Sequence, residues 1–232
     1  DFRLVVTELH AGRRETVEFR CREAFRPGAQ RRIEAFDGTI VDRDAYRVEA
    51  VFLDHKVPCL AFRLEEKRRV NVMKNALAEM GLPSGAWINE LKDSIHRNEP
   101  DESAFRVWWK GEDRRAVERV FPLGELKGRI TKITPGQKIV YVSDVIGSPE
   151  NTGRIVEFAR GADTLFVEAC FLEEDRERAG EKYHLTARQA GRLARLAGVK
   201  RFVLFHHSPK YRGKEERFEE EARRAFREEG VL

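Results

Sequence analysis

Cysteine is scarce in this sequence, and long apolar runs are missing. The three cysteines are widely spaced and odd in number, which argues against a disulfide framework and for a reducing compartment; we expect Cys21, Cys59 and Cys170 to be buried thiols. No stretch approaches the roughly 18 consecutive apolar residues of a membrane-spanning helix. The start, DFRLVVTELH, lacks the charged and apolar regions of a secretory signal. The sequence therefore predicts a cytoplasmic protein without a membrane partner.

A large net charge is missing too. The 44 lysines and arginines nearly balance the 40 aspartates and glutamates, which leaves a formal charge of +4. Such a balance permits a nucleic-acid partner without requiring one, because phosphate binding depends on local clusters of basic residues more than on net charge. With 232 residues and 41% hydrophobic content, the chain is long enough for a sizeable core. One large domain fits this length better than two small ones.

The first 135 residues contain predicted strands followed by a less regular stretch. Residues 1–46 are polar and rich in turns, and short apolar alternations there predict two or three strands. Residues 47–53 and 59–66 predict two further strands, joined by a tight polar turn that carries His55. Residues 67–135 look irregular apart from a short helix pattern, VMKNALAEMG. We expect an insertion or arm in this stretch.

From Lys138 onward the pattern becomes regular. The runs KIVYVSD, TLFVEACF and RFVLFHH alternate with helical segments of about 10 to 13 residues, which indicates a layered α/β domain. Thr186 and Gln189 form a capping box that starts one helix, and Gly198 is placed to end it. The tail KEERFEEEARRAFREE has apolar residues at helical spacing among dense charges, which predicts a surface helix with a narrow apolar stripe.

Metal-capable side chains follow three of the predicted strands. His55 follows the run AVFLD, Asp144 follows IVYVS, and His206 follows FVLF. Because sites in layered α/β folds gather where strand ends converge, these residues could meet, and imidazole with carboxylate suits zinc or manganese rather than calcium. The alternative is that each is an ordinary turn or capping residue. Two further histidines favour the metal-site interpretation. His184 lies just before a predicted helix, and His207 directly follows His206.

Four longer stretches carry a family resemblance. They read VFLDHKVPCLAFRLEEK, KIVYVSD, ADTLFVEACF and KYHLTARQAGRLARLAGVKRFVLFHHSPKY. In order, spacing and context they resemble the successive motifs of ribonuclease Z, the tRNA 3′-processing endonuclease of the metallo-β-lactamase superfamily. The resemblance implies an α/β fold, the four-layer αββα sandwich, of which this chain supplies the C-terminal portion, about two-thirds. It implies a single metallo-hydrolase-like domain over residues 1–232, with an insertion or arm at about 67–135.

The resemblance also implies roles for individual residues. His55 and His206 would be terminal ligands of two different Zn²⁺ ions, with Mn²⁺ as the other candidate, and Asp144 would bridge the ions. His184 would protonate the leaving group or stabilise the transition state. Other expected roles are hydrogen-bond partners of the ligands (Glu168, Thr186) and substrate binding (Ser208, Lys210, Tyr211). For Glu168, a solvated carboxylate at a strand end is an equally good interpretation of the sequence.

The sequence departs from the family pattern at several positions. Val145 and Leu185 replace a threonine and a serine, which removes two hydroxyl groups beside the metal centre. Lys210 precedes Tyr211 where the family has arginine, so the positive charge is kept but the bidentate fork for phosphate is lost. We therefore expect substrate handling to differ.

The superfamily's signature, His-x-His-x-Asp-His, is absent from the sequence. Without it each ion keeps one histidine and the shared Asp144, fewer than the roughly three protein ligands of a catalytic zinc. The chain alone should therefore bind metal weakly. Three interpretations remain open: a portion of a longer enzyme, one partner of a split enzyme, or a degenerate homologue. The start at Asp1 rather than methionine favours the first and leads us to expect further sequence upstream.

The expected function is a metal-dependent endoribonuclease that cleaves tRNA precursors at the 3′ side with a water activated by two metal ions, acting as a homodimer. The alternatives are hydrolysis of another small phosphodiester or ester, and a non-catalytic binding module. Trp108 and Trp109 could stack on bases, although packing is the more frequent role. Basic residues of the arm could contact phosphates. They are Lys67, Arg68, Arg69, Lys110, Arg114 and Arg115.

Overall fold

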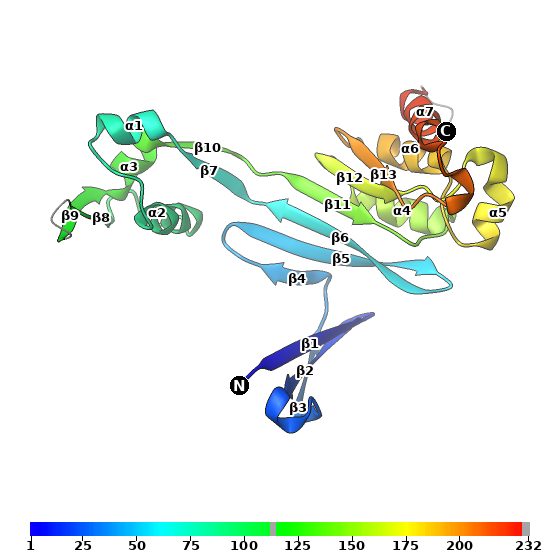
Figure 1. Ribbon diagram of the computed structural model, residues 1–232, viewed down its shortest axis with the longest axis horizontal. Helices are drawn as coiled ribbons and strands as arrows, with labels where there is room; N and C mark the ends of the chain where they lie inside the picture. The colour runs from blue at the N-terminus through cyan, green and yellow to red at the C-terminus, as the bar shows by residue number, and fades with distance from the viewer. Residues whose placement is uncertain (112–114, 229–232) are drawn as a thin grey trace.

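A computed structural model of the chain describes residues 1–111 and 115–228 (Figure 1). Within these ranges the strands form a central sheet of six strands, a three-stranded sheet and two two-stranded ribbons. The helices gather in two groups, one beside the central sheet and one beyond the end of a long ribbon. In the part of the chain that the structure describes, no helix is long and apolar enough to cross a membrane.

The central sheet combines strands from both halves of the sequence. Its order is β13-β12-β11-β6-β5-β4; β11 to β13 run parallel, whereas β11, β6, β5 and β4 pair antiparallel. Runs rich in Val, Ile, Leu and Phe favour these strands because branched and aromatic side chains pack well on a pleated sheet. The predicted strands are confirmed. They are β4 (Thr39–Asp42), β5 (Tyr46–His55), β6 (Val57–Glu66), β11 (Lys138–Val142), β12 (Thr164–Glu168) and β13 (Phe202–Phe205).

Helices cover one face of this sheet. Helix α4 (Pro149–Phe158) contacts β5, and α6 (Ala187–Leu196) contacts β12 and β13. Strand residues on this face, such as Leu53, Val140 and Val167, belong to one buried core cluster with the helices. The capping box predicted from the sequence starts α6. A short helix, α5 (Arg176–Glu181), precedes it. The layered α/β class is therefore confirmed.

The charged tail forms α7 (Glu215–Arg227), whose narrow apolar stripe packs on α6. Phe218, Ala222 and Ala225 in this stripe are buried. The two helices approach so closely that a Cβ atom at Gly191 would lie 2.1 Å from the carbonyl oxygen of Ala222. Position 191 therefore needs glycine, and the predicted amphipathic helix is confirmed.

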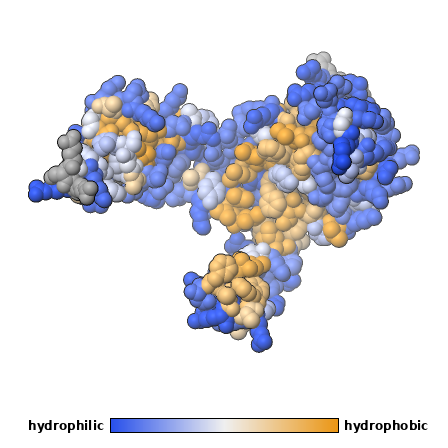
Figure 2. All heavy atoms as spheres, viewed as in Figure 1, coloured by the Kyte–Doolittle hydropathy of each residue, from blue (hydrophilic) through white to orange (hydrophobic). Residues whose placement is uncertain are grey.

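The opposite face of the central sheet is apolar and open to solvent. The strand registers place Phe62 beside Tyr141, Tyr141 beside Phe166, and Phe166 beside Val203 in one row across four strands. Phe62, Tyr141 and Val203 are each about two-fifths exposed, at 39%, 44% and 38%. Figure 2 shows apolar atoms gathered over this part of the molecule. We call this row, with Leu64 at 38% exposure, the open face.

The N-terminal strands form a separate antiparallel meander. β1 (Arg3–His10), β2 (Arg13–Arg20) and β3 (Pro27–Ala35) pair in the order β1-β2-β3, and the meander extends away from the central sheet in Figure 1. At its near end, Leu9 and His10 line a pocket together with Phe52 of β5. A short 3₁₀ turn, η1 (Cys21–Glu23), follows β2. Phe36 packs edge-on against Phe52 of β5, with ring centroids 6.4 Å apart. The sequence predicted two or three strands in residues 1–46, and the structure has four there, β1 to β4.

Residues 67–135 form an arm with its own apolar core, so the expectation of irregular structure is wrong. β7 and β10 pair as an antiparallel ribbon that leads away from the central sheet, and three helices and a hairpin lie at its end (Figure 1). Trp87, Leu91 and Leu126 are fully buried in the arm's core. The elements are β7 (Arg68–Val72), α1 (Lys74–Glu79), α2 (Trp87–His96), β8 (Ala104–Lys110), β9 (Ala116–Pro122), α3 (Leu123–Ile130) and β10 (Thr131–Pro135).

Several of the aromatic and basic residues noted in the arm have structural partners. Trp108 and Trp109 pack against the arm's core, which agrees with the interpretation of these two residues as packing residues. Arg68 donates a hydrogen bond to Asn98 and Arg69 forms an ion pair with Glu66. Arg114 lies outside the described residues.

The three cysteines differ in burial. Cys170 is buried and Cys59 is partly buried, but Cys21 is exposed at the end of the meander, so the expectation of three buried thiols is wrong there. The meander offers Cys21 little apolar cover, because it is a single sheet with no helix packed on it. Burial raises the pKa of the Cys59 and Cys170 thiols to about 11 in each case. The absence of a disulfide framework agrees with this distribution.

Candidate metal centre

Asp144 and His206 follow parallel strands in backbone conformations that residues other than glycine rarely adopt. Asp144 comes after β11 with φ +52°, and His206 comes after β13 with φ +65°. Left-handed conformations of this kind cost free energy and concentrate at functional sites. The two side chains meet at one edge of the sheet, where His206 Nδ1 lies 3.7 Å from Asp144 Oδ1.

Glu168, the last residue of β12, lies between these two strand ends and is completely buried. Its Oε1 accepts a hydrogen bond from the Val145 N–H at 2.8 Å, which holds the loop after Asp144. Its Oε2 lies 2.8 Å from His184 Nδ1 and 3.1 Å from His206 Nδ1. The interpretation of Glu168 as a solvated carboxylate is therefore wrong. This one side chain connects the loops that follow three different elements.

Burial dominates the electrostatics of this cluster. It raises the pKa of Glu168 to about 7, although the Val145 N–H and the neighbouring His206 both favour the charged form. Burial also lowers the pKa of His184, and the nearby His55 lowers it further. The contact between the Glu168 carboxyl group and the His184 imidazole, at 2.8 Å, is an arrangement suited to general acid–base catalysis.

His55 joins the cluster from the tip of the β5–β6 hairpin. Its Nδ1 lies 2.7 Å from the carbonyl oxygen of Tyr183, so Nδ1 carries the hydrogen and donates it. That hydrogen bond leaves Nε2 as the nitrogen available to a metal ion. The His55 ring lies 4.8 Å from the His184 ring, and the His184 ring lies 5.1 Å from that of His206, between centroids. The three imidazoles therefore form one continuous group.

Four of these side chains could hold a metal ion. One ligand atom from each lies within 4.8 Å of all the others, and the set contains two carboxylates and two imidazoles. Nitrogen and oxygen donors of this kind fit zinc or manganese. The site is open to a substrate, because the side chains of Asp144 and His206 are 48% and 40% exposed. The four residues are Asp144, Glu168, His184 and His206.

Part of the chain matches a known family. Residues 126–207 match the family model described as the beta-lactamase superfamily domain, and that range contains all four residues of the metal-capable group. Ribonuclease Z of Myxococcus xanthus is 34% identical over 179 residues, which is 77% of this chain and 51% of that protein. Ribonuclease Z of Deinococcus radiodurans is 29% identical over 197 residues, which is 85% of this chain and 55% of that protein.

This chain is a relative of ribonuclease Z. The resemblance stated from the sequence motifs is thus confirmed, as is the α/β fold of the metallo-β-lactamase type. The chain spans about half the length of the curated ribonuclease Z relatives that it matches. The central sheet and the helices on one of its faces form one sheet layer and one helix layer.

Solved structures with low sequence identity are similar to this chain as well. The metallo-beta-lactamase fold protein YhfI from Bacillus subtilis is 15% identical, with a TM-score of 0.45, and the match covers 82% of this chain and 47% of that protein. The short form of human tRNase Z is 20% identical, with a TM-score of 0.41, and the match covers 75% of this chain and 42% of that protein.

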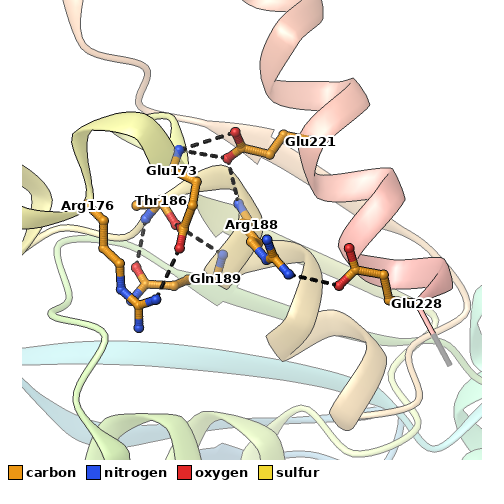
Figure 3. Close-up of polar contacts among 7 residues, drawn as sticks. All are labelled: Glu173, Arg176, Thr186, Arg188, Gln189, Glu221 and Glu228. Carbon is orange, nitrogen blue, oxygen red and sulfur yellow. Dashed lines mark hydrogen bonds and ion pairs between the residues drawn. The ribbon is translucent and has the colours of Figure 1, made fainter. Parts of the chain in front are cut away.

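Thr186, expected beside the metal ligands of a ribonuclease Z-like site, has its hydroxyl engaged elsewhere. The Thr186 hydroxyl donates to Glu173 at 2.6 Å and accepts the Gln189 N–H at 3.1 Å (Figure 3). Both contacts secure the start of α6 and the short 3₁₀ turn η2 (Glu173–Asp175). Its described contacts therefore give Thr186 a capping role.

Lys210 and Tyr211, expected to bind substrate, are tied to the loop that follows β12. The Lys210 ammonium lies 2.6 Å from Asp175 Oδ2, and the Tyr211 hydroxyl donates to the same carboxylate. Tyr211 is 3% exposed, and burial together with the bond to Asp175 raises its pKa to about 12. The Ser208 hydroxyl caps the turn η3 (Pro209–Tyr211). All three expected substrate residues thus have partners within the fold.

Tyr183 is a site residue that the sequence did not reveal. Its carbonyl oxygen orients His55, its ring packs edge-on against the His55 ring, and the Lys56 ammonium lies 4.8 Å from the centre of the Tyr183 ring. Tyr183 has φ +61° and Lys56 has φ +64°. A backbone carbonyl carries no residue-type signal, so sequence reasoning alone could not have identified this contact.

Proposed function

We propose that this chain supplies one half of the active site of a metal-dependent phosphodiesterase of the ribonuclease Z type, which cleaves tRNA precursors at the 3′ side. The observation that carries the proposal is the convergence of two carboxylates and two imidazoles within 4.8 Å. Asp144, Glu168 and His206 lie at the ends of β11, β12 and β13, and His184 lies in the loop between α5 and α6. Support comes from the ribonuclease Z relatives of which the chain spans about half.

The proposed ligands are His55 and His206, one for each of two ions, with Asp144 shared between them. When bound, zinc or manganese ions supply an activated water and neutralise charge on the scissile phosphate. The contribution of the chain is to hold the donors. The Tyr183 carbonyl keeps Nε2 of His55 available, and the left-handed turn at Asp144 presents its carboxylate to the open edge of the sheet.

His184 is the proposed proton donor to the leaving oxygen. Glu168 accepts the Nδ1–H of His184 at 2.8 Å, which orients the ring and leaves Nε2 as the nitrogen that exchanges a proton. The side chain of His184 is 16% exposed, so a substrate can approach it while Glu168 stays dry. The buried Glu168 carboxylate therefore orients the ring, and the partly exposed His184 imidazole exchanges the proton.

The proposed active protein contains a further polypeptide segment. His55 and His206 with a shared Asp144 give each ion two protein ligands, one fewer than a catalytic zinc ordinarily has. The open face of the central sheet is apolar over four strands, which is typical of a surface that another layer covers. We propose that this segment supplies the remaining ligands and covers the open face.

We propose that residues 1–232 form a single metallo-hydrolase-like domain in which the arm of residues 67–135 is an insertion. The proposed role of the arm is to contact RNA. The ribbon of β7 and β10 carries the arm's globular end away from the central sheet, so the arm could reach a part of the substrate distant from the scissile bond (Figure 1). Contacts would come through surface lysines and arginines, because both tryptophans of β8 pack inward.

The test of the proposed function uses the protein purified together with any polypeptide that covers the open face. His206→Ala should reduce cleavage of a tRNA precursor with a 3′ trailer, and hydrolysis of bis(p-nitrophenyl) phosphate, by at least about a hundredfold, because one ion loses its histidine. His96→Ala is the control for hydrolysis of the small diester, since His96 is the last residue of α2 in the arm. Unchanged turnover in the His206 variant would exclude the ligand assignment. Activity on the small diester but not on the precursor would favour a small-molecule hydrolase.

A further inference from the structure

A buried asparagine links the loops that carry two of the proposed ligands. Asn151 lies in the first turn of α4 and is 2% exposed. The Ser148 hydroxyl accepts the Asn151 backbone N–H at 3.2 Å and so fixes the first turn of the helix. The Asn151 side chain points away from solvent into the space between the end of β5 and the loop after β11, as its hydrogen bonds require.

The side-chain amide of Asn151 makes three hydrogen bonds, all with backbone groups. Its Oδ1 accepts the Asp54 N–H at 3.1 Å, and its Nδ2 donates to the carbonyl oxygens of Asp54 at 3.0 Å and Ile146 at 2.9 Å. The Asp54 carbonyl also accepts the Ile146 N–H at 3.1 Å. Both amide hydrogens of Asn151 are therefore used, and one side chain closes a network between two loops that are distant in sequence.

The positions of these two loops matter because each loop carries a proposed metal ligand. Asp54 is directly followed by His55, and Ile146 comes two residues after Asp144. Neither ligand candidate is touched by Asn151 itself. A side chain that fixes both backbones fixes the separation of the His55 imidazole and the Asp144 carboxylate.

We propose that Asn151 is a positioning residue that sets the distance between His55 and Asp144 and thereby the geometry of one metal position. The proposal rests on the proposed function, because it presumes that these two side chains share an ion. Partners that orient ligands in this way influence metal affinity without contacting the ion. The asparagine is specifically required, because only a side chain with one acceptor and two donors matches the Asp54 N–H and the two carbonyl groups.

The experiment compares three variants of the full 232-residue chain. Asn151→Asp keeps the size and one acceptor but loses both donors, and Asn151→Ala loses all three bonds. Ser148→Ala is the matched control, because it removes the bond to the Asn151 backbone N–H that caps the same helix turn and leaves the three side-chain bonds of Asn151 in place. Two quantities are measured below the melting temperature of every variant: hydrogen exchange of the Ile146 amide by NMR, and Mn²⁺ affinity by electron paramagnetic resonance.

The Ile146 amide is the reporter because its partner is Asp54 and not the substituted side chain. Both Asn151 variants should speed its exchange and weaken Mn²⁺ binding by about tenfold, whereas Ser148→Ala should change neither. The proposal is overturned if Ile146 exchange and Mn²⁺ affinity stay at parent values in the Asn151→Asp variant. It is also overturned if Ser148→Ala changes them equally. If the parent chain binds no Mn²⁺ without the further segment, Ile146 exchange alone decides whether Asn151 holds the two loops. The proposed function is tested separately by hydrolysis in the His206→Ala variant.

Discussion

At the scale of single residues, the buried carboxylate of Glu168 accounts for most of the site's organisation. Removing a carboxylate from water is costly unless hydrogen bonds replace the lost hydration. Glu168 has three nitrogen partners, from Val145, His184 and His206, and each partner belongs to a different loop. The hydrogen bonds that offset the cost of burying Glu168 therefore also fix the positions of His184, the proposed proton donor, and of His206, a proposed metal ligand.

Glu168→Gln tests this organising role. The amide has one acceptor oxygen and one donor nitrogen, so at least one buried N–H loses its partner, at a cost of about 1–3 kcal/mol in the free energy of unfolding. We expect kcat for phosphodiester hydrolysis to fall about tenfold to a hundredfold with a smaller change in KM, because the ring of His184 is no longer held. Urea titration and steady-state kinetics measure the two effects.

Glu174→Gln is the control for that variant, because Glu174 is exposed and pairs only with Arg217 among its described ion pairs. It should leave kcat unchanged. A Glu168→Gln protein with parental kcat and lower stability would mean that Glu168 serves packing alone.

The residues of the candidate site differ in how well the sequence alone could predict them. His55, Asp144 and His206 could be predicted because each follows a strand, and the ends of neighbouring strands meet at one edge. The burial of Glu168 could not be predicted, because a glutamate at the end of a strand has the same local sequence pattern whether helices or water lie beyond it. Asn151 gave no signal either, since its partners are backbone groups of loops distant in sequence.

At the scale of elements, α6, α7 and the turn η2 are joined by the carboxylate of Glu221. Its Oε1 accepts the backbone N–H of Glu173 and that of Arg188, each at 3.0 Å (Figure 3). The Arg188 N–H belongs to the first turn of α6, where backbone donors have no partner within the helix. A side chain from α7 thus completes the start of α6 and holds the loop that follows Glu168.

The pH dependence of stability should reveal this carboxylate. Burial raises the pKa of Glu221 above its ordinary value of 4.5. A raised folded-state pKa means that the folded chain holds the proton more tightly than the unfolded chain. The stabilisation is therefore complete below the unfolded pKa and is lost as pH rises through the folded pKa. Glu221→Gln, whose single oxygen can still accept both N–H groups, should become more stable relative to the parent as pH rises above the ordinary glutamate pKa of 4.5.

Urea unfolding at a series of pH values measures this difference. We expect it to stay below about 1 kcal/mol, because the carboxylate is only half-buried and partly screened by water. Glu219→Gln on the exposed side of α7 is the control and should show no such trend. A parent and a Glu221→Gln variant with parallel pH profiles would contradict the prediction.

The elements also differ in how well the sequence predicted them. The start of α6 was predictable because its capping box is local, and the strands of the central sheet were predictable because their apolar runs are long enough to recognise. The arm was not, because charged and polar residues interrupt its strands, as in β7 (RRVNV) and β10 (TKITP), whereas β11 (KIVYV) and β13 (FVLF) are nearly continuous apolar runs. The elements of the arm are ordered by a shared core around Trp87 and Leu91, which no local pattern reveals.

At the scale of the whole molecule, the open face and the candidate metal centre belong to the same sheet. The strands β11, β12 and β13 that end at the metal-capable group also carry Tyr141, Phe166 and Val203 of the open face. A layer that covers this face would therefore lie next to the metal centre. Stability and completion of the site are expected to depend on the same interaction.

Self-association of the isolated chain tests this dependence. With its apolar row exposed, the chain should form dimers or larger species, and light scattering after size exclusion should give a mass above that of a monomer. Replacing Phe62 and Tyr141 together by threonine, which keeps the β-propensity but removes apolar area, should weaken association by about tenfold or more. Val120→Thr is the control, because Val120 is 65% exposed on the arm and outside the open face. A parent chain that stays monomeric and melts cooperatively at high concentration would show that the open face needs no cover, and would count against the proposed further segment.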